Sequence, residues 1–418
     1  MSSSAAFTLE QGISHLASIV GPEHVGLCGE ASQTIVAAPA DANEIAEILR
    51  FANANLLTVA PIGGGTKQRW GNPVAADIEL SLNRMCELPE HAWQDMTCTV
   101  QAGCSWAAMQ GQLQQHGQMV ALDPLWPQRA TVGGIVACND SGALRLKYGS
   151  LRDLIIGMTI VRADGTIAKS GGKVVKNVAG YDIHKLMTGS LGTLGVISEV
   201  NFRLHPLEEH ARTWTALLPD GAGCASLGAP LNALMDSQIV PSSVQVRVSK
   251  SGCAADVRIA GLPECLDEYG TRIHQIFAGL ALTESSEGVW AARQSLFENA
   301  TAVVLKVAVL PREICDVSAE LLAWSGDTAN TEIVAQATGL MTVSISSALE
   351  TAISVLQRFR ARVAQSGGSV VVLQAPDPIK RQIDIWGPDP GTLPLMREIK
   401  CRFDPHRILN PGRFVGSI

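Results

Sequence analysis

Apolar and polar positions alternate in short blocks along the first half of the chain and predict strands separated by helices. Residues 34–38 are typical of a short strand, and an amphipathic helix follows. Asp41 stands at its N-cap, Glu44 completes a capping box, and apolar residues recur at helical spacing: Ile45, Ile48, Leu49 and Ala52. Residues 56–62 then predict a buried strand, which gives the order strand, helix, strand.

A second group of elements follows. Residues 97–102 predict a strand, and the next helix carries Trp106, Met109 and Leu113 on one face and ends near Gly117. Residues 154–162 and 166–170 flank a turn signal, which indicates a hairpin, and residues 193–204 predict another strand.

The pattern changes after Pro206, where the glycine-rich motifs stop. Strand-like runs at 243–248 and 303–309 alternate with helical ones such as 348–365, and we expect about two βαβ-type units without a recognisable sequence repeat. The last part of the chain is rich in proline. These changes predict three parts, which are residues 1–206, 207–375 and 376–418.

Composition narrows the class of protein. The chain has 418 residues, a net charge of −7 and 17% charged residues, against about 25% in a typical domain. These values exclude a disordered acidic tail and argue against nucleic acid as a partner. No apolar run reaches the roughly 18 residues of a membrane span. With no signal peptide either, we expect a cytoplasmic protein that reaches the inner face of the cell membrane only through partners.

The ten cysteines are spread singly along the chain, and none forms a C-x-x-C pair. This spacing favours buried reduced thiols over a disulfide framework, a zinc site or an iron–sulfur cluster. We therefore expect no metal site, and a redox enzyme of this kind would pass its electrons to another protein.

Three glycine-rich segments could approach an anionic ligand closely. They are Pro61-Ile62-Gly63-Gly64-Gly65-Thr66 after a buried strand, Thr131-Val132-Gly133-Gly134 before a short helix, and the run from Gly189 to Gly195. Glycine permits backbone conformations in which successive N–H groups surround a phosphate, although each segment alone also fits an ordinary loop. Three of them in one domain favour a long phosphate-containing ligand over a mononucleotide.

Residues 61–71, 131–139 and above all GKVVKNVAGYDIHKL at 172–186 resemble the PCMH-type FAD-binding domain of the vanillyl-alcohol-oxidase flavoprotein family. The run DPHRILNPGRF at 404–414 resembles the C-terminal signature of the same family. The resemblance covers about half the chain. Within the family it points to the FAD-binding subunits of bacterial glycolate oxidases, which are D-2-hydroxyacid dehydrogenase complexes.

This resemblance implies an α+β fold. A PCMH-type FAD-binding domain of two α+β subdomains would be followed by a smaller α+β cap domain and a C-terminal segment that returns to the FAD domain. The resemblance also implies which residues hold FAD: Pro61, Ile62, Gly63, Gly64, Gly65, Thr66, Thr131, Gly133, Gly134, Asn139, Gly189, Gly192, Thr193, Gly195, Ile197 and Asn410. Many members bind FAD covalently through a histidine after the first glycines. Here Thr66 and Lys67 follow them, so we expect non-covalent FAD.

The family chemistry would oxidise a small 2-hydroxyacid, such as glycolate to glyoxylate, and pass electrons through the flavin to an iron–sulfur partner subunit beside a second FAD subunit. Such a reaction needs a cation for the substrate carboxylate and a base for its hydroxyl proton. We take His184 as the candidate base, with Lys173 and Arg413 as further catalytic candidates. Structural roles remain open for each, and other available cations are Arg129, Arg145, Lys147 and Lys176.

The cap region offers few metal ligands, since His210 and His274 are its histidines and lie far apart in sequence. Three interpretations stay open at this point. The chain could be a catalytic subunit of a glycolate oxidase, a non-catalytic subunit whose FAD relays electrons or supports assembly, or a stand-alone FAD oxidoreductase with another alcohol substrate.

Overall fold

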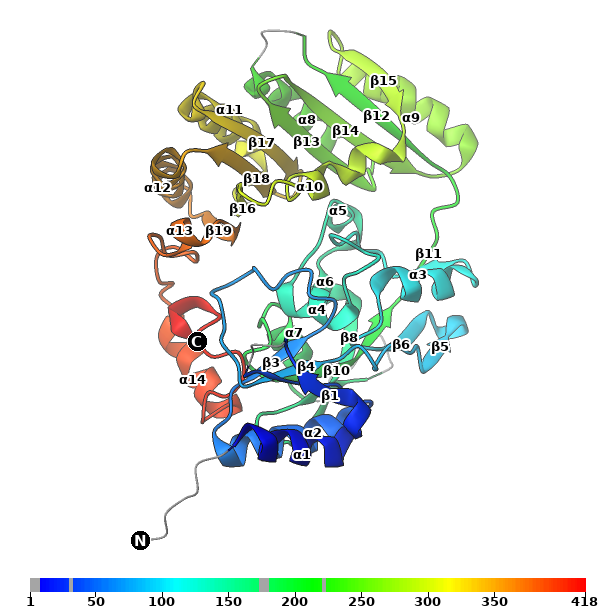
Figure 1. The fold of residues 1–418 in the computed structure, drawn as a ribbon. Helices are drawn as coiled ribbons and strands as arrows, with labels where there is room; N and C mark the ends of the chain where they lie inside the picture. Colours follow the sequence, from blue (N-terminus) through cyan, green and yellow to red (C-terminus); the bar gives the residue numbers. More distant parts are fainter. Residues whose placement is uncertain (1–7, 30–32, 173–179, 220–222) are drawn as a thin grey trace. The chain divides into compact units, whose positions relative to one another are not determined.

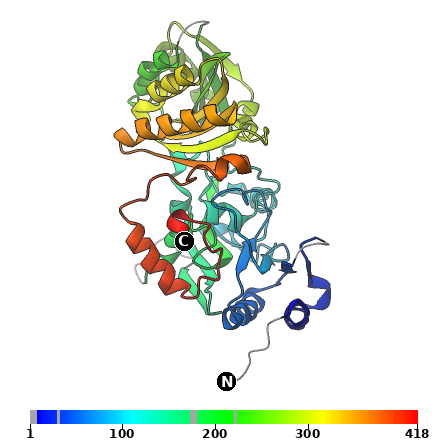
Figure 2. The same ribbon diagram turned by 60° about the vertical axis from the view of Figure 1, so that its left-hand side comes forward.

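The computed structural model describes residues 8–29, 33–172, 180–219 and 223–418 (Figures 1 and 2). Their contacts define two units. Unit 1 comprises the described parts of Met1–Asp140, Ser150–Leu207 and Asp389–Ile418, and unit 2 comprises those of Ser141–Gly149 and Glu208–Pro388. A segment of nine residues inside the first half of the chain therefore belongs to unit 2.

The first half of unit 1 is a four-stranded sheet in the order β1-β2-β4-β3. Its elements are α1 (Leu9–Val20), β1 (Val25–Leu27), β2 (Ile35–Ala37), α2 (Ala42–Asn55), β3 (Val59–Ile62) and β4 (Ile78–Ser81). Strand β4 pairs in parallel with both β2 and β3. The helix α2 begins where the sequence predicts, because Asp41 Oδ1 accepts hydrogen bonds from Asn43 N at 2.7 Å and Glu44 N at 2.9 Å. Glu44 itself accepts from Ala40 N rather than from the N-cap residue.

The second half of unit 1 is a five-stranded antiparallel sheet in the order β5-β6-β10-β8-β9. Its strands are β5 (Glu90–Ala92), β6 (Thr97–Gln101), β8 (Ile155–Val161), β9 (Ile167–Gly171) and β10 (Val196–Arg203), and β7 (Gln118–Met119) pairs separately with β11 (His205–Pro206). Its helices are α3 (Trp106–Gln114), α4 (Val132–Cys138), α6 (Leu151–Leu154) and α7 (Ile183–Met187). Helix α2 packs against β8 and β9, so one apolar core joins both halves.

The C-terminal segment returns to unit 1 through α14 (Leu393–Phe403) and the loop after it (Figure 2). Val59 N donates to Ile408 O at 2.7 Å and Asn410 N donates to Val59 O at 3.0 Å, so this loop lies beside β3. The last residues of the chain are thereby brought to the point where β3 leads into the first glycine-rich segment.

Unit 2 is built on one eight-stranded sheet in which every pairing is antiparallel, in the order β15-β12-β14-β13-β17-β18-β16-β19. Its strands are β12 (Ala211–Leu217), β13 (Ser243–Ser249), β14 (Gly252–Ala260), β15 (Ala281–Ser285), β16 (Val303–Ala308), β17 (Ala329–Gln336), β18 (Leu340–Ser347) and β19 (Ser369–Gln374). Its helices are α5 (Arg145–Tyr148), α8 (Gly228–Met235), α9 (Pro263–Ile276), α10 (Ala292–Ser295), α11 (Ile314–Ser325), α12 (Leu349–Gln365) and α13 (Asp377–Lys380).

The order of these elements shows a structural repeat that the sequence does not reveal. The run β12-α8-β13-β14-α9-β15 and the run β16-α11-β17-β18-α12-β19 are both β-α-β-β-α-β units. The two units meet through β13 and β17, and the strand order of the second mirrors that of the first. The expectation of two βαβ-type units was therefore right in number but incomplete, because each holds a hairpin between its two helices. Across the parts of the chain that the structure describes, no helix is long and apolar enough to cross a membrane.

Candidate functional site

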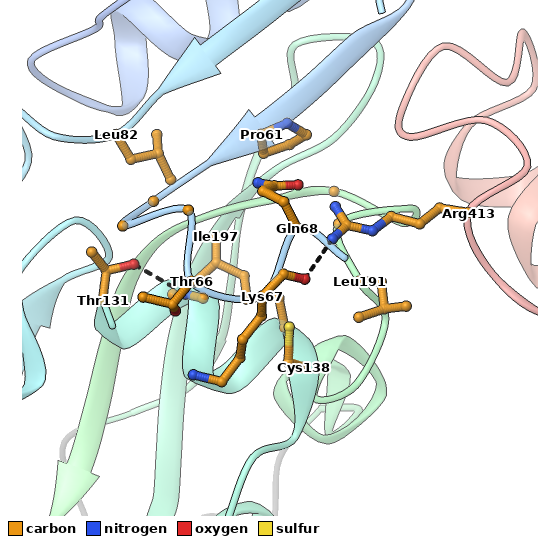
Figure 3. Close-up of a pocket in the computed structure, with 18 residues that line it drawn as sticks. Pro61, Thr66, Lys67, Gln68, Leu82, Thr131, Cys138, Leu191, Ile197 and Arg413 are labelled. Carbon is orange, nitrogen blue, oxygen red and sulfur yellow. Dashed lines mark hydrogen bonds between the residues drawn. The ribbon is translucent and has the colours of Figure 1, made fainter. Parts of the chain in front are cut away.

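One pocket of unit 1 brings together residues from five separate parts of the sequence (Figure 3). The residues that line it and that the sequence predicts as site residues are Pro61, Gly63, Gly64, Gly65, Thr66, Thr131, Gly133, Gly134, Gly192, Gly195, Ile197 and Arg413. All of these residues belong to unit 1. The pocket thus lies where β3, α4, β10 and the C-terminal loop converge.

The first loop lies directly on the residues that precede α4. A Cβ atom added to Gly63 would come 2.0 Å from Thr131 Oγ1, and one added to Gly64 would come 1.8 Å from the backbone oxygen of Arg129. Gly65 has a φ of +68° and open space beside it. The missing side chains therefore let the loop pack tightly on one side and leave its backbone exposed to the pocket on the other.

The short helix expected after this segment is α4, and Thr131 is its N-cap, with Oγ1 accepting from Gly134 N at 3.4 Å. Gly133 N donates to Ala102 O at 2.8 Å, and a Cβ there would come 2.8 Å from the Ala102 side chain. Gly133 therefore serves close packing of α4 on the adjacent sheet, and its amide is already used. Asn139 ends α4 in a left-handed conformation.

The third glycine-rich segment closes the pocket beside the C-terminal loop. Gly192 has a φ of +73°, and a Cβ there would come 2.8 Å from Asn410 Nδ2. That amide donates to Leu191 O at 2.8 Å, while Asn410 Oδ1 is buried without a partner among the described residues. Thr193 is buried, and its Oγ1 donates to Ser190 O at 2.7 Å. The predicted residues that do not line the pocket are Ile62, Asn139, Gly189, Thr193 and Asn410.

Arg413 lines the pocket, but its guanidinium holds the first loop in place. Its Nε donates to Trp70 O and its Nη2 donates to Lys67 O, each at 3.2 Å. The side chain is buried, and burial lowers the pKa of its guanidinium. These two hydrogen bonds connect the Arg413 guanidinium to the backbone that follows the first loop.

Six further residues line the pocket without having been predicted: Lys67, Gln68, Leu82, Ala137, Cys138 and Leu191. Five are neighbours of predicted residues in sequence, so extending each glycine motif by a few residues would have found them. Leu82 follows β4, the strand that pairs with β3, and only knowledge of that parallel pairing would have placed it here.

Of the other two catalytic candidates, the structure describes His184, which does not line this pocket. His184 lies in α7, where Ser170 Oγ is 3.1 Å from its Nδ1 and donates its own proton to Tyr181 O at 2.9 Å. His184 Nδ1 must then be the donor in that pair. Burial lowers the pKa of His184, which favours the neutral form of the ring. Lys173 lies outside the described residues.

The residues of the pocket fit a dinucleotide cofactor. A glycine cradle offers backbone to a pyrophosphate, and apolar side chains of Leu82, Leu191 and Ile197 form walls suited to an aromatic base or ring. Lys67 and Arg413 add positive charge. Within the described parts of the chain no cluster of three or more His, Cys, Asp or Glu side chains could hold a metal.

Matches to known protein families indicate that the cofactor is FAD. The FAD binding domain family matches residues 34–171, and the C-terminal domain family of FAD linked oxidases matches residues 387–414. In these two regions the chain therefore resembles FAD-linked oxidases. The first match contains the loop of residues 61–66 and α4, and the second contains Asn410 and Arg413, so both meet at the pocket.

The curated relatives that the chain matches include proteins named after a 2-hydroxyacid substrate. The glycolate oxidase subunit GlcD of Bacillus subtilis is 32% identical over 211 residues, which cover 50% of this chain and 44% of that one. D-lactate dehydrogenase of Archaeoglobus fulgidus is 36% identical over 42% of this chain and 40% of its own. The bovine mitochondrial D-2-hydroxyglutarate dehydrogenase is 27% identical over 92% and 77%. The chain spans less than half the length of the first relatives it matches.

Some solved structures resemble this chain over almost its whole length. 4-Ethylphenol oxidase from Gulosibacter chungangensis aligns with a TM-score of 0.76 at 14% identity and covers 98% of this chain and 97% of its own. p-Cresol methylhydroxylase aligns with a TM-score of 0.74 at 14% identity over 97% and 96%. The predicted α+β fold, with an FAD domain and a C-terminal segment returning to it, is confirmed.

Proposed function

We propose that this chain is an FAD-dependent dehydrogenase of 2-hydroxyacids, with glycolate as the first substrate to test, and that it works as the FAD-binding subunit of a glycolate oxidase complex. The observation that carries the proposal is the glycine-walled pocket at which both FAD-family matches meet. The names of the curated relatives, which include glycolate, D-lactate and D-2-hydroxyglutarate, support a 2-hydroxyacid substrate.

Under this proposal, the residues of the chain would have the following roles. Bound FAD supplies the hydride acceptor, and the protein supplies position and electrostatics. Residues 61–66 and the Gly192–Gly195 turn would hold the cofactor, and Arg413 would keep the first loop in shape through the carbonyl oxygens of Lys67 and Trp70. His184, whose Nδ1 pairs with Ser170, would support the fold rather than abstract a proton at this pocket.

We propose that FAD is held without a covalent bond, because Thr66 stands where many family members carry the attaching histidine. The measurement is acid precipitation of the purified holoprotein. We expect the yellow colour to remain in the supernatant, and colour that stays with the pellet would reject non-covalent binding.

The decisive experiment is an anaerobic titration of the purified holoprotein with glycolate while the flavin absorbance is followed. D-Lactate and D-2-hydroxyglutarate serve as comparison substrates, and dithionite shows that the flavin can be reduced. Bleaching by glycolate supports the proposal. Bleaching by dithionite but by none of the three acids would reject a substrate-oxidising role for this chain.

The positions of the catalytic candidates support a second candidate function, in which this chain does not itself oxidise the substrate. Of the two that the structure describes, Arg413 is engaged with backbone carbonyls and His184 does not line the pocket. The chain would then relay electrons or support assembly beside a second FAD subunit and an iron–sulfur subunit. This interpretation predicts that glycolate bleaches the flavin only after the second FAD subunit is added. A stand-alone oxidoreductase would instead turn over an alcohol with an artificial acceptor and no partner.

A further inference from the structure

Three residues at or beside the pocket have a backbone conformation that is rare for residues other than glycine. Asn139, Leu191 and Asn410 have φ values of +47°, +53° and +41°, which lie in the left-handed region. Asparagine visits this region more readily than other residues with a Cβ atom, because its short polar side chain can form local hydrogen bonds. Leucine has no such compensation, so Leu191 is the most strained of the three.

In this conformation the two backbone groups of Leu191 bond to different segments. Its N–H donates to Ala137 O in α4 at 2.9 Å, and its carbonyl oxygen accepts from Asn410 Nδ2 at 2.8 Å. A second bond to α4 runs from Gly189 N to Val136 O at 3.0 Å. The third glycine-rich segment is therefore joined to α4 and, through Leu191, to the C-terminal loop.

The side chain of Leu191 packs where the C-terminal loop meets the residues that follow the first loop. Leu191 is 6% exposed. Its Cδ1 lies 3.1 Å from the position that a Cβ of Gly71 would take, and Arg413 O and Arg413 Cγ lie 2.8 Å and 3.0 Å from that position. Asn72 N donates to Arg413 O at 2.9 Å, which holds these two stretches of backbone together.

Glycine at position 191 would adopt the same backbone conformation without strain. The segment uses glycine in this way at Gly189 and Gly192, whose φ values are +88° and +73°. What leucine adds at position 191 is a buried apolar side chain beside Gly71 and Arg413. Strained residues persist where their surroundings fix them, and they cluster at functional sites.

We propose that Leu191 is a positioning residue for FAD binding, which holds the third glycine-rich segment, α4 and the C-terminal loop in the arrangement that forms the pocket. Each of these segments lines the pocket, through Gly192, Ala137 and Arg413 respectively (Figure 3). A shift of the segment relative to α4 or to the loop therefore changes the walls of the pocket. The proposal rests on the proposed function only in that FAD is bound.

The test measures the FAD dissociation constant by titrating the full-length chain after removal of its flavin. The temperature is one at which circular dichroism shows every variant to be folded, so that a loss of general stability does not by itself change the constant. We expect Leu191→Gly to raise the dissociation constant about tenfold or more, because glycine permits the backbone conformation but removes the supporting side chain. An unchanged constant in this variant overturns the proposal.

Leu191→Met keeps an apolar side chain of similar size and should stay within about threefold of the unaltered protein. Leu56→Gly is the matched control, because Leu56 has a φ of +55°, ends α2 and is 65% exposed. It should leave the FAD dissociation constant unchanged. A loss of affinity in Leu191→Met or in Leu56→Gly as large as that in Leu191→Gly would also overturn the proposal.

If Leu191→Gly does not fold, Leu191→Ala tests the same contact, because it removes the side-chain atoms beyond Cβ. Its dissociation constant should rise about threefold or more, and an unchanged constant rejects the proposal. Failure of glycolate to bleach the flavin would reject the proposed function and leave these affinities measurable.

Discussion

At the scale of single residues, glycine is required in the first loop for two separate reasons. The first is conformational freedom, which the sequence indicates and which applies to Gly65, because its φ is +68°. Gly63 and Gly64 are required for a different reason, because their Cβ atoms would collide with Thr131 and with the backbone of Arg129. This second requirement comes from tertiary packing, which no local motif expresses.

Gly64→Val should therefore remove FAD binding while unit 2 stays folded. A Cβ 1.8 Å from the oxygen of Arg129 forces the loop away from α4 and disrupts the cradle. The measurement is the flavin-to-protein absorbance ratio after gel filtration, with circular dichroism to check the fold. Gly111→Ala, where a Cβ meets nothing within 4 Å, is the control. Full FAD content in Gly64→Val would exclude this loop from the site.

A single carboxylate in unit 2 should govern its stability in acid. Glu208 Oε1 accepts hydrogen bonds from Tyr148 Oη and Ser242 Oγ, each at 2.7 Å, and its carboxylate pairs with Arg258. Burial alone would raise the pKa of Glu208, but these hydrogen bonds and the Arg258 guanidinium lower it to about 2 from 4.5.

Because the folded pKa lies below the unfolded value, Glu208 stabilises unit 2 fully above pH 4.5 and loses this contribution as pH falls towards 2. We expect a loss of about 2 kcal/mol over that window after allowance for solvent screening. In Glu208→Gln the unfolding free energy of unit 2 should be lower at pH 7 and depend less on pH below 4.5. Equal acid sensitivity of both proteins in urea titrations would contradict this assignment.

At the scale of elements, a buried ion pair contributes to the attachment of the C-terminal loop to the pocket. Lys400 Nζ in α14 contacts Asp404 Oδ2 at 2.7 Å and donates to Thr193 O at 2.7 Å and Leu409 O at 2.9 Å. Asp404 in turn accepts from Ile408 N at 3.0 Å and Leu409 N at 2.8 Å. The pair therefore joins α14, the glycine-rich turn and the loop that carries Asn410 and Arg413.

Asp404→Asn should destabilise unit 1 and weaken FAD binding together. The substitution leaves the Lys400 ammonium buried without its counter-charge, and losing one partner of a buried pair costs about 3 kcal/mol or more. Chemical unfolding and FAD titration measure the two effects. Glu398→Gln alters a nearby pair between Glu398 and Arg402 at 3.7 Å, with side chains 65% and 80% exposed, and should change neither quantity. Unaltered stability in Asp404→Asn would show that the pair is dispensable.

The elements also show what the sequence can and cannot predict. Helix α2, strand β10 and the glycine-rich segments follow from local rules of capping, periodicity and turn chemistry, and they lie close to their expected positions. The repeat in unit 2 does not follow from such rules, because it is expressed in the pairing of strands such as β13 with β17. Leu82 escaped assignment for a similar reason, since only the parallel pairing of β4 with β3 brings it to the pocket.

At the scale of the whole molecule, the two units differ in what they contribute to the proposed reaction. The pocket lies within unit 1, and so do both FAD-family matches apart from residues 141–149 and 387–388. Unit 2 has its own core under α8, α9, α11 and α12. Unfolding of such a chain need not be a single two-state transition. A ligand that binds one unit stabilises that unit first, and the two cores can therefore respond differently to FAD.

We expect FAD to slow hydrogen exchange selectively in unit 1. A ligand at a hundred times its dissociation constant stabilises the form that binds it by about 2.7 kcal/mol. The effect should be greatest around residues 61–68 and α4, which line the pocket, and absent from β13 and β17 at the centre of the unit 2 sheet. Exchange measured by mass spectrometry with and without FAD tests this, with AMP at the same concentration as the control for adenine binding alone. Equal protection of β13 and β17 would mean that the two units open as one cooperative body, and no protection of residues 61–68 would place FAD elsewhere.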